Sequence, residues 1–358
     1  MSISRQNSHQ SSRATVAFVP REVFSTTKRS LETLLERTHE PIDLVCIDGA
    51  SPPPVAAYLK QTAAERGFTL LRSDRYLTPN QARNLAAEWA LAKLPSPNLV
   101  FVDNDVLVTP GWIDGLVDCA EETGAGVVGP AYFEHLPERQ RLHMFGGTCR
   151  IDVDDQGRRI YHERHDLAHT PINQVGQPLT RHETELIEFH TVLVRREVFE
   201  QVGLFDEGFF CTSEHGDLCL SARKAGFSIW VDPDAQITYA PPRRLDPADR
   251  EFFFLRWSDA WTTATHKRMV EKWGLDVVPN THGRGLDWVR GHRRLGLQSP
   301  RMLRKIVGPR LGRSLEKRVI APLDNIANRH RYPLDVYGEL QEPKMSVVYS
   351  PTSQRQAA

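Results

Sequence analysis

The chain has 358 residues, of which 40% are hydrophobic and 25% are charged, as in an ordinary soluble globular protein. Lys and Arg together number 45, as do Asp and Glu, so no overall charge favours a nucleic acid or a membrane as partner. A chain of this length folds as one large domain or as two.

Positive charge is nevertheless concentrated near the C-terminus. Between Arg290 and Arg318, ten Lys or Arg residues are accompanied by a single acid, Glu316. Such a stretch is either a solvated arm or a surface that docks on anionic lipid. Peripheral membrane contact through residues 290–318 is therefore one hypothesis.

The cysteines and the N-terminus indicate a cytoplasmic protein. Five cysteines are scattered along the chain without a CxxC pair, which favours reduced thiols. Residues 1–13 are rich in Ser and Gln and lack an apolar core, so we expect a disordered tail rather than a secretory signal. Any membrane contact is then expected at the inner face of the membrane.

Strands and helices alternate along the first hundred residues. Short apolar runs predict strands, and helical spacing of apolar residues predicts the helices between them. The predicted strands are Ala14–Val19, Ile42–Ile47, Phe68–Arg72 and Leu99–Val102, and the predicted helices are Ser25–Arg37, Val55–Arg66 and Pro79–Lys93. This alternation predicts a mainly parallel sheet that is flanked by helices on both faces.

The second half of the chain is less regular. Strands are predicted at Ala125–Gly129, Glu188–Val194 and Ser228–Val231, and helices at Arg196–Val202, Asp217–Ala225 and Glu251–Trp273. Residues 139–186 are polar with weak periodicity, and the last forty residues are expected to be poorly ordered. We expect an α/β domain over 14–240, a helical extension over 241–300 packed on it, and a basic, Pro-containing segment over 301–358.

Two carboxylates follow the fourth predicted strand directly. Asp103 and Asp105 flank Asn104 at the carboxyl end of that strand, where ligands bind in parallel sheets. Carboxylates at this spacing can converge on one hard cation such as Mg²⁺ or Mn²⁺. The alternative is a turn that caps the following segment.

Six segments, in order between about Ala14 and Trp273, resemble motifs of the inverting family 2 glycosyltransferases, which have the GT-A fold. They are CIDGAS at 46–51, QARNLA at 81–86, FVDND at 101–105, VRREVF through VGLFDE at 194–207, EHGDLC at 214–219 and KWG at 272–274. The resemblance implies a Rossmann-like nucleotide-binding sheet and transfer of a sugar from a nucleotide-sugar by single displacement.

The resemblance also implies roles on the donor side. Asp48 would bind the nucleotide base, with the alternative that it only satisfies the turn after it. Arg83 and Asn84 would line the donor site, unless they form a solvated helical face. Asp103, Asn104 and Asp105 would form the metal motif, in which Asp105, helped by Asp103, holds the ion on the donor diphosphate.

On the acceptor side the sequence departs from the family pattern. The carboxylate that usually activates the acceptor is replaced by His215, whose imidazole could act as a base near neutrality. Glu214 or Asp217 could hold that role instead. His190, beside a predicted strand, is a candidate for the acceptor site, and most of the other histidines of the middle segment are expected at the surface. Tyr239 stands where relatives often have a metal-binding histidine.

The sequence therefore predicts a metal-assisted, inverting glycosyltransferase that uses a UDP-, GDP- or dTDP-sugar and a glycan, lipid-linked or other hydroxyl acceptor, in the setting of surface polysaccharide or glycoconjugate synthesis. A non-catalytic protein that binds nucleotide-sugars or glycans is the main alternative, because fold alone does not guarantee activity. A nucleotidyltransferase is a third.

Overall fold

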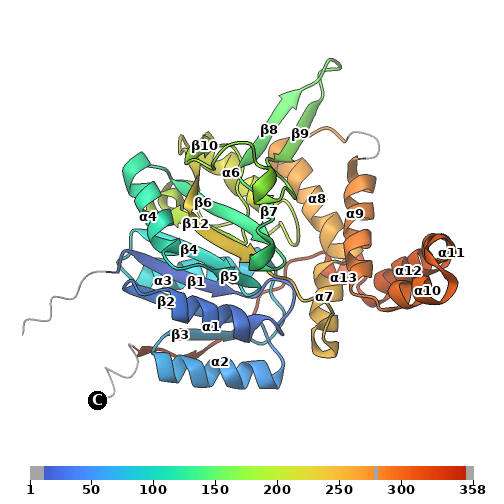
Figure 1. Cartoon of the computed structure of the whole chain (residues 1–358), viewed down its shortest axis with the longest axis horizontal. Coiled ribbons are helices and arrows are strands. Elements are labelled where there is room, and N and C mark those ends of the chain that lie inside the picture. Colours follow the sequence, from blue (N-terminus) through green and yellow to red (C-terminus); the bar gives the residue numbers. More distant parts are fainter. Residues whose placement is uncertain (1–11, 278–280, 352–358) are drawn as a thin grey trace, which may run out of the picture.

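The computed structural model describes residues 12–277 and 281–351 of the chain, and its centre is one large twisted sheet (Figure 1). Its strands are β1 (Ala14–Val19), β2 (Ile42–Asp48), β3 (Thr69–Ser73), β4 (Asn98–Asp103), β6 (Val127–Glu134), β10 (His182–Thr184), β11 (Thr191–Arg195), β12 (Ile229–Tyr239) and β13 (Met345–Tyr349). They are ordered β10-β12-β6-β11-β4-β1-β2-β3-β13, with β5 (Val106–Val108) paired to β12 and β7 (Leu142–Met144) paired to β6.

The half of the sheet formed by β4, β1, β2 and β3 is parallel, as predicted. These strands are almost wholly buried because helices cover both faces, which explains their continuous apolar runs. Val19 pairs with Asp103, and Phe18 pairs with Cys46, so the carboxyl ends of the three central strands meet at one edge. The predicted polar clusters therefore lie at the same edge of the sheet.

The flanking helices are α1 (Thr27–Arg37), α2 (Pro53–Arg66), α3 (Pro79–Lys93), α4 (Trp112–Thr123), α5 (Arg196–Val202) and α6 (Glu214–Lys224). Local sequence fixes the start of α3, because Thr78 and Gln81 form a reciprocal capping box and Pro79 is the first helical residue. Helix α6 begins three residues earlier than predicted. His215 consequently lies in its first turn, not in a loop ahead of it.

The other half of the sheet is mixed. Strand β11 is antiparallel to both β4 and β6, whereas β12 is parallel to β6. The polar residues of the middle segment fold into the hairpin β8 (Gly147–Val153) and β9 (Arg159–His165), which stands above the sheet (Figure 1). Half of the hairpin is exposed, and its apolar alternation is confined to Cys149, Ile151 and Val153 of β8, which is too short a pattern to predict the hairpin from sequence.

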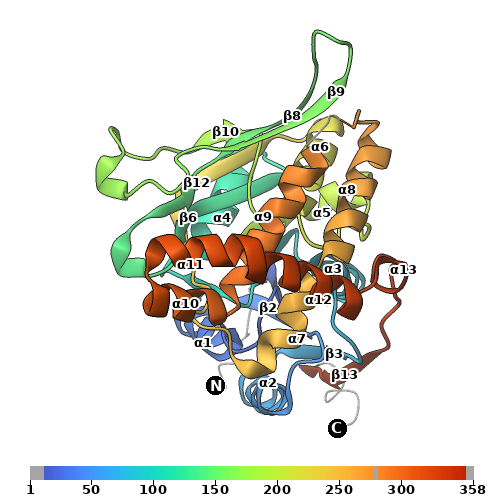
Figure 2. The same cartoon turned by 90° about the vertical axis from the view of Figure 1, so that its right-hand side faces the viewer.

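Helices at the C-terminal end pack beside the sheet and then across it (Figure 2). They are α7 (Arg250–Arg256), α8 (Asp259–Trp273), α9 (Thr281–Leu295), α10 (Ser299–Val307), α11 (Pro309–Leu315), a π-helical turn at Glu316–Ile320, α12 (Ala321–Arg331) and α13 (Leu334–Tyr337). The single predicted helix at 251–273 is two helices, because Ser258 leaves the helical conformation and caps α8 by accepting a hydrogen bond from the Trp261 amide.

The prediction of poor order near the C-terminus is wrong for the part of the chain that the structure describes. Residues 321–337 are largely helical, and β13 pairs antiparallel with β3, with Met345 opposite Ser73. This pairing covers an edge that β3 would otherwise leave open. The predicted N-terminal tail falls almost entirely on residues 1–11, outside the described residues. Among the helices of the described ranges, none is long and apolar enough to cross a bilayer.

Candidate active site

Two adjoining hollows open at the carboxyl ends of the parallel strands. The large cavity, about 1150 Å³, lies between the sheet edge, hairpin β8–β9 and helices α7 to α9. The small cleft, about 490 Å³, lies beside Asp105 and the first turn of α1. Both are lined by His135, Pro241, Pro242 and Arg243, so they form one continuous site.

Asp103, Asp105 and His190 meet at this site. Asp103 ends β4, and His190 precedes the antiparallel strand β11, where the Asp103 amide donates to the His190 carbonyl at 3.0 Å. One ligand atom from each of the three side chains lies within 4.8 Å of the other two. Asp103 Oδ2, both carboxylate oxygens of Asp105 and His190 Nδ1 are buried without a hydrogen-bond partner. Such orphaned acceptors are what a bound divalent cation would satisfy.

The electrostatics of this group fit a cation. Burial, reinforced by Glu22 and Asp103 and opposed by Arg21, raises the pKa of Asp105 to about 8. Burial likewise raises the pKa of Asp103, although Arg83 and Arg21 lie nearby. Burial and the charge of Arg21 hold the pKa of His190 well below its usual value, so its imidazole is neutral and can act as a ligand. With a pKa of about 8, Asp105 retains a proton near neutrality, and a bound metal ion would displace it.

Arg21 supplies positive charge to this group, although the sequence motifs do not identify it as a site residue. Its Nε lies 3.3 Å from Asp103 Oδ2 and its Nη1 lies 3.5 Å from Asp105 Oδ2. Nη1 also donates to the Tyr239 hydroxyl at 3.1 Å, and the Tyr239 ring stacks on His190 with 4.1 Å between centroids. Tyr239 therefore orients Arg21 and His190, and His190 offers the imidazole that the sequence lacks at position 239. A sequence feature that could have indicated this role is the position of Arg21, two residues after the end of the first strand.

Arg83 and Asn104 hold Asp103 and Arg21 in position. Arg83 is 1% exposed, so the alternative of a solvated helical face is wrong for it. Its Nη2 lies 3.0 Å from Asp103 Oδ1, and its guanidinium covers the Phe189 ring. Asn104 accepts a hydrogen bond from the Arg21 amide and donates to the Val23 carbonyl and the Thr27 hydroxyl. It thereby fixes the segment that carries Arg21.

Two predicted donor-binding residues lie apart from both hollows. Asn84 is buried. Its side-chain NH₂ donates to the Phe205 carbonyl and to the Glu207 carboxylate, and its side-chain oxygen accepts from the Phe205 amide, so Asn84 holds the loop after α5 in place. Asp48 accepts a hydrogen bond from the Ser51 amide and forms an ion pair with Arg72. The turn interaction considered for Asp48 is thus present, and its recognition of a base stays a prediction.

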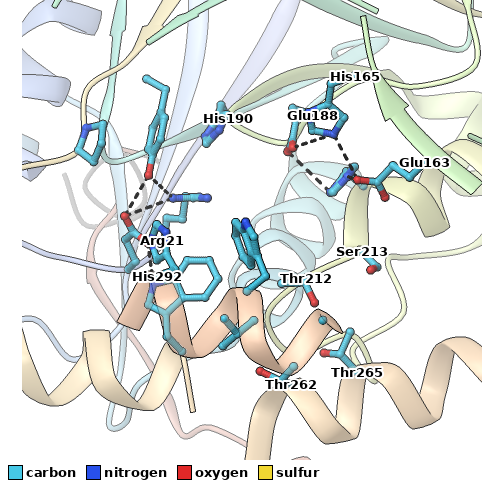
Figure 3. A pocket seen from close by; sticks show the side chains of 18 of the residues that line it. Arg21, Glu163, His165, Glu188, His190, Thr212, Ser213, Thr262, Thr265 and His292 are labelled. Carbon is cyan, nitrogen blue, oxygen red and sulfur yellow. Dashed lines mark hydrogen bonds and ion pairs between the residues drawn. The ribbon is translucent and has the colours of Figure 1, made fainter. Parts of the chain in front are cut away.

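The opposite end of the large cavity is lined by His215, Glu163, His165 and Glu188. Figure 3 shows Glu163, His165 and Glu188 together at one end, Arg21 and His292 at the other, and His190 between them. His215 Nε2 lies 3.3 Å from Glu163 Oε1, and its Nδ1 lies 3.7 Å from Glu188 Oε2. Sequence motifs assign no role to Glu163 or Glu188, because Glu163 of β9 and Glu188 of the segment before β11 become neighbours of His215 only in the folded structure.

This cluster holds His215 in its charged form. Burial favours the neutral imidazole, but Glu188 and Glu163 outweigh burial and raise the pKa of His215 to about 10. In turn, the charge of His215 and hydrogen bonds from His165 and Tyr161 overcome the effect of burial and hold the pKa of Glu163 well below its usual value. An imidazolium has no lone pair with which to accept a proton, whereas the two carboxylates beside it do.

The two predicted alternatives to His215 do not line the large cavity or the small cleft. Glu214 pairs with buried Arg256 at 3.2 Å. Asp217 accepts hydrogen bonds from Lys272 Nζ at 2.7 Å and from Trp273 Nε1 at 2.9 Å, which ties α6 to α8. Of the three side chains, His215 is thus the one that faces the site.

Other histidines of the middle segment also line the large cavity. His143 and His165 are partly buried there and are exceptions to the expectation that most of these histidines lie at the surface. Three further groups of His and Glu side chains have a spacing compatible with a metal: Glu134, His143 and His169; His143, His165 and Glu188; and Glu163, His165 and His215. Each of them has one carboxylate and two histidines, and Glu134 already pairs with Arg141 at 2.8 Å. The Asp103 group, with two carboxylates, better suits Mg²⁺ or Mn²⁺.

A search of solved structures finds the crystal structure of GalNAc-T7 with UDP, GalNAc and Mn2+ at 16% identity and a TM-score of 0.49; the match covers 91% of this chain and 59% of that one. It also finds the mannosyltransferase PcManGT from Pyrobaculum calidifontis in complex with GDP-Man and Mn2+ at 14% identity and a TM-score of 0.46, covering 92% and 85% of the two chains. A search of curated proteins finds no match.

The family model described as glycosyl transferase family 2 matches residues 21–203, which include the Asp103 group and hairpin β8–β9. This range spans half of the chain, and the mixed α/β sheet with its flanking helices agrees with the predicted fold. The chain belongs to glycosyl transferase family 2.

Proposed function

We propose that the protein transfers a sugar with inversion from a nucleoside-diphosphate sugar to an acceptor hydroxyl, assisted by Mn²⁺ or Mg²⁺ held by Asp103, Asp105 and His190. One observation carries this proposal: buried, unpartnered carboxylate oxygens converge where the small cleft and the large cavity meet. Arg21 lies 3.3 Å from Asp103 Oδ2 and 3.5 Å from Asp105 Oδ2 without hydrogen bonding to either of these oxygens, and a buried oxygen without a hydrogen bond is costly, so a site of this kind favours a cationic ligand.

The small cleft suits the donor diphosphate. Beside Asp105 it is lined by the side chains of Arg29, Arg139 and Arg243. It also borders the first turn of α1, where the Thr26 hydroxyl is buried and unpartnered and the helix terminus favours negative charge. When bound, the divalent ion would neutralise the leaving diphosphate. Arg21 and the cleft arginines would share that charge.

The large cavity suits the acceptor. We assign removal of the acceptor proton to the carboxylates Glu163 and Glu188, because the same two side chains keep His215 protonated. His215 would then fix both carboxylates and donate a hydrogen bond to the acceptor. The proton passes from the acceptor hydroxyl to a carboxylate oxygen as the hydroxyl oxygen bonds to the anomeric carbon and the bond to the diphosphate breaks. His190, between the two ends, would contact the ion rather than the acceptor.

A panel of UDP-, GDP- and dTDP-sugars with and without Mn²⁺ tests this function. We expect one donor to bind only with the metal and to be transferred, or slowly hydrolysed, with release of the nucleoside diphosphate. Binding without turnover would favour the non-catalytic alternative. Release of pyrophosphate would favour a nucleotidyltransferase. Polysaccharide or glycoconjugate synthesis is the setting in which we expect the product to be used.

A further inference from the structure

Helices α10, α11 and α12 and the π-helical turn between the last two form a strongly basic unit. Figure 2 shows them lying across the face turned to the viewer, outside α9 and the sheet. Residues 299–331 contain nine Lys or Arg residues and two acids, Glu316 and Asp324. Glu316 pairs with Arg304, Asp324 pairs with Arg293 of α9, and Arg329 and Arg331 pair with Asp259 and Glu251 outside the unit. Within the described residues, six of the nine cations have no carboxylate partner: Arg301, Lys305, Arg310, Arg313, Lys317 and Arg318.

The same unit exposes large apolar side chains in helical register. Met302 and Ile306 are one turn apart on α10, and Ile306 is 77% exposed. Val319, Leu323 and Ile326 are spaced by four and three residues, and the last two are 61% and 65% exposed. Residues at this spacing share one side of a helix. We call this set of exposed apolar and basic side chains on residues 299–331 the basic face.

We propose that the basic face docks on the surface of a membrane that contains anionic lipid. Basic side chains together with exposed apolar side chains are the combination that binds such an interface, because the charges attract the headgroups and the apolar groups enter the acyl boundary. A soluble polyanion would use the charge and leave the apolar side chains in water. A second copy joined through the same face would bring like charges together.

The basic face lies next to one end of the large cavity, so docking would also decide which acceptors reach the cavity; this step rests on the proposed function. The large cavity extends from His215 to Trp288, Leu295, Gly296 and Arg301, next to the start of α10. Trp288 and Leu295 are more than half exposed, and Val289 and Phe253 add apolar wall. Docking would hold this end of the cavity near the bilayer, so the acceptor class is a hydroxyl on a membrane-borne, lipid-linked molecule.

Vesicle sedimentation of the full chain tests the docking. We expect binding to vesicles of phosphatidylcholine with about one third phosphatidylglycerol at low salt, weaker binding at high salt, and little binding to phosphatidylcholine alone. Reversing two charges, Arg310→Glu with Arg318→Glu, should weaken binding by at least about tenfold. Met302→Ser with Ile306→Ser should also weaken it, and the matched control on α2, Lys60→Glu with Arg66→Glu, should not.

Any of four outcomes would contradict the docking. The first three are a lack of binding to anionic vesicles at low salt, equal binding to neutral vesicles, and basic-face variants that bind as well as the control variant. The fourth is a wild-type dimer in solution that Ile306→Ser dissociates without changing vesicle binding. Unchanged thermal unfolding of the variants excludes loss of fold. Donor hydrolysis without vesicles reports on the proposed function separately, because the variants leave the Asp103 group and the cleft arginines intact.

Discussion

The small cleft beside Asp105 and the far end of the large cavity around His215 are built from different kinds of side chain. Permanent cations, Arg29, Arg139 and Arg243, line the cleft, with Arg21 at the junction. Imidazoles and carboxylates line the far end, with His165 and His215 against Glu163 and Glu188. A leaving diphosphate needs charge that does not titrate near neutrality, whereas an acceptor hydroxyl needs groups that exchange protons. The two ends match these two needs.

The largest expected effect concerns the proton-exchanging end. Replacing Glu163 and Glu188 together with Gln should lower the single-turnover rate of transfer by about 10²–10⁴-fold, because no carboxylate would remain to accept the proton. Donor binding, measured by calorimetry, should be preserved. Asp152→Asn, on the exposed part of hairpin β8–β9, is the matched control and should transfer at the wild-type rate.

His215→Gln separates this assignment from the predicted histidine base. We expect a smaller loss than in the double carboxylate variant, since His215→Gln loses the group that orients the carboxylates and contacts the acceptor but keeps both proton-accepting carboxylates. If His215→Gln abolishes transfer while the double carboxylate variant works within a few-fold of wild type, the imidazole is the base. If Asp217→Asn alone abolishes transfer with the fold intact, the base is Asp217.

A second prediction concerns Glu214, which sequence motifs placed among the catalytic candidates. Arg256→Met should destabilise the protein by about 3–5 kcal/mol, because it leaves the Glu214 carboxylate buried without its cation. Arg304→Met, which removes an exposed partner of Glu316, should cost about 0–1 kcal/mol. Urea unfolding measures both. A Glu214→Gln variant that keeps its stability and loses transfer would return Glu214 to the catalytic group.

The smallest expected effect is the pH dependence contributed by His215. Its folded pKa is raised to about 10 by Glu188, Glu163 and Glu214, with burial opposing them, so its contribution to stability is present below about pH 6.5 and is lost as pH rises towards 10. His165 faces the same carboxylates. The stability difference between wild type and His215→Gln should therefore shrink by at least about 1.4 kcal/mol over that range. A difference that is constant or grows would show that His215 is not held as a cation.

The sequence predicted the cleft side of the site better than the far end for a physical reason. Asp103 and Asp105 follow a buried strand directly, so their convergence is local, and the parallel pairing of the strands follows from the alternation of strands and helices. Glu163 comes from a polar segment with weak periodicity, and Glu188 stands at the start of a predicted strand far from it in sequence. They meet His215 only through tertiary packing, Glu163 from hairpin β8–β9 and Glu188 from the segment before β11.

The C-terminal part of the chain illustrates the same limit. Strand β13 forms because β3 offers a free edge, and its sequence, rich in Val and Tyr, becomes informative only once that edge exists. Helix propensity and apolar spacing in residues 299–331 are local, but the exposed side of these helices shows only in the fold. The sequence therefore indicates the basic stretch through its charge, whereas its exposed apolar side chains become apparent only in the structure.

Calorimetric titration of the preferred nucleotide-sugar into wild type and Asp105→Asn, with Mn²⁺ and with a chelator, tests the central claim most directly. We expect wild type to bind the donor with Mn²⁺ and to lose at least about tenfold in affinity with the chelator, whereas Asp105→Asn should bind weakly and equally in both, with an unchanged fold. Equal donor affinity in wild type with Mn²⁺ and with chelator, together with full transfer by Asp105→Asn, would contradict a metal site at Asp103, Asp105 and His190 and leave the arginines of the cleft as the groups that bind the diphosphate.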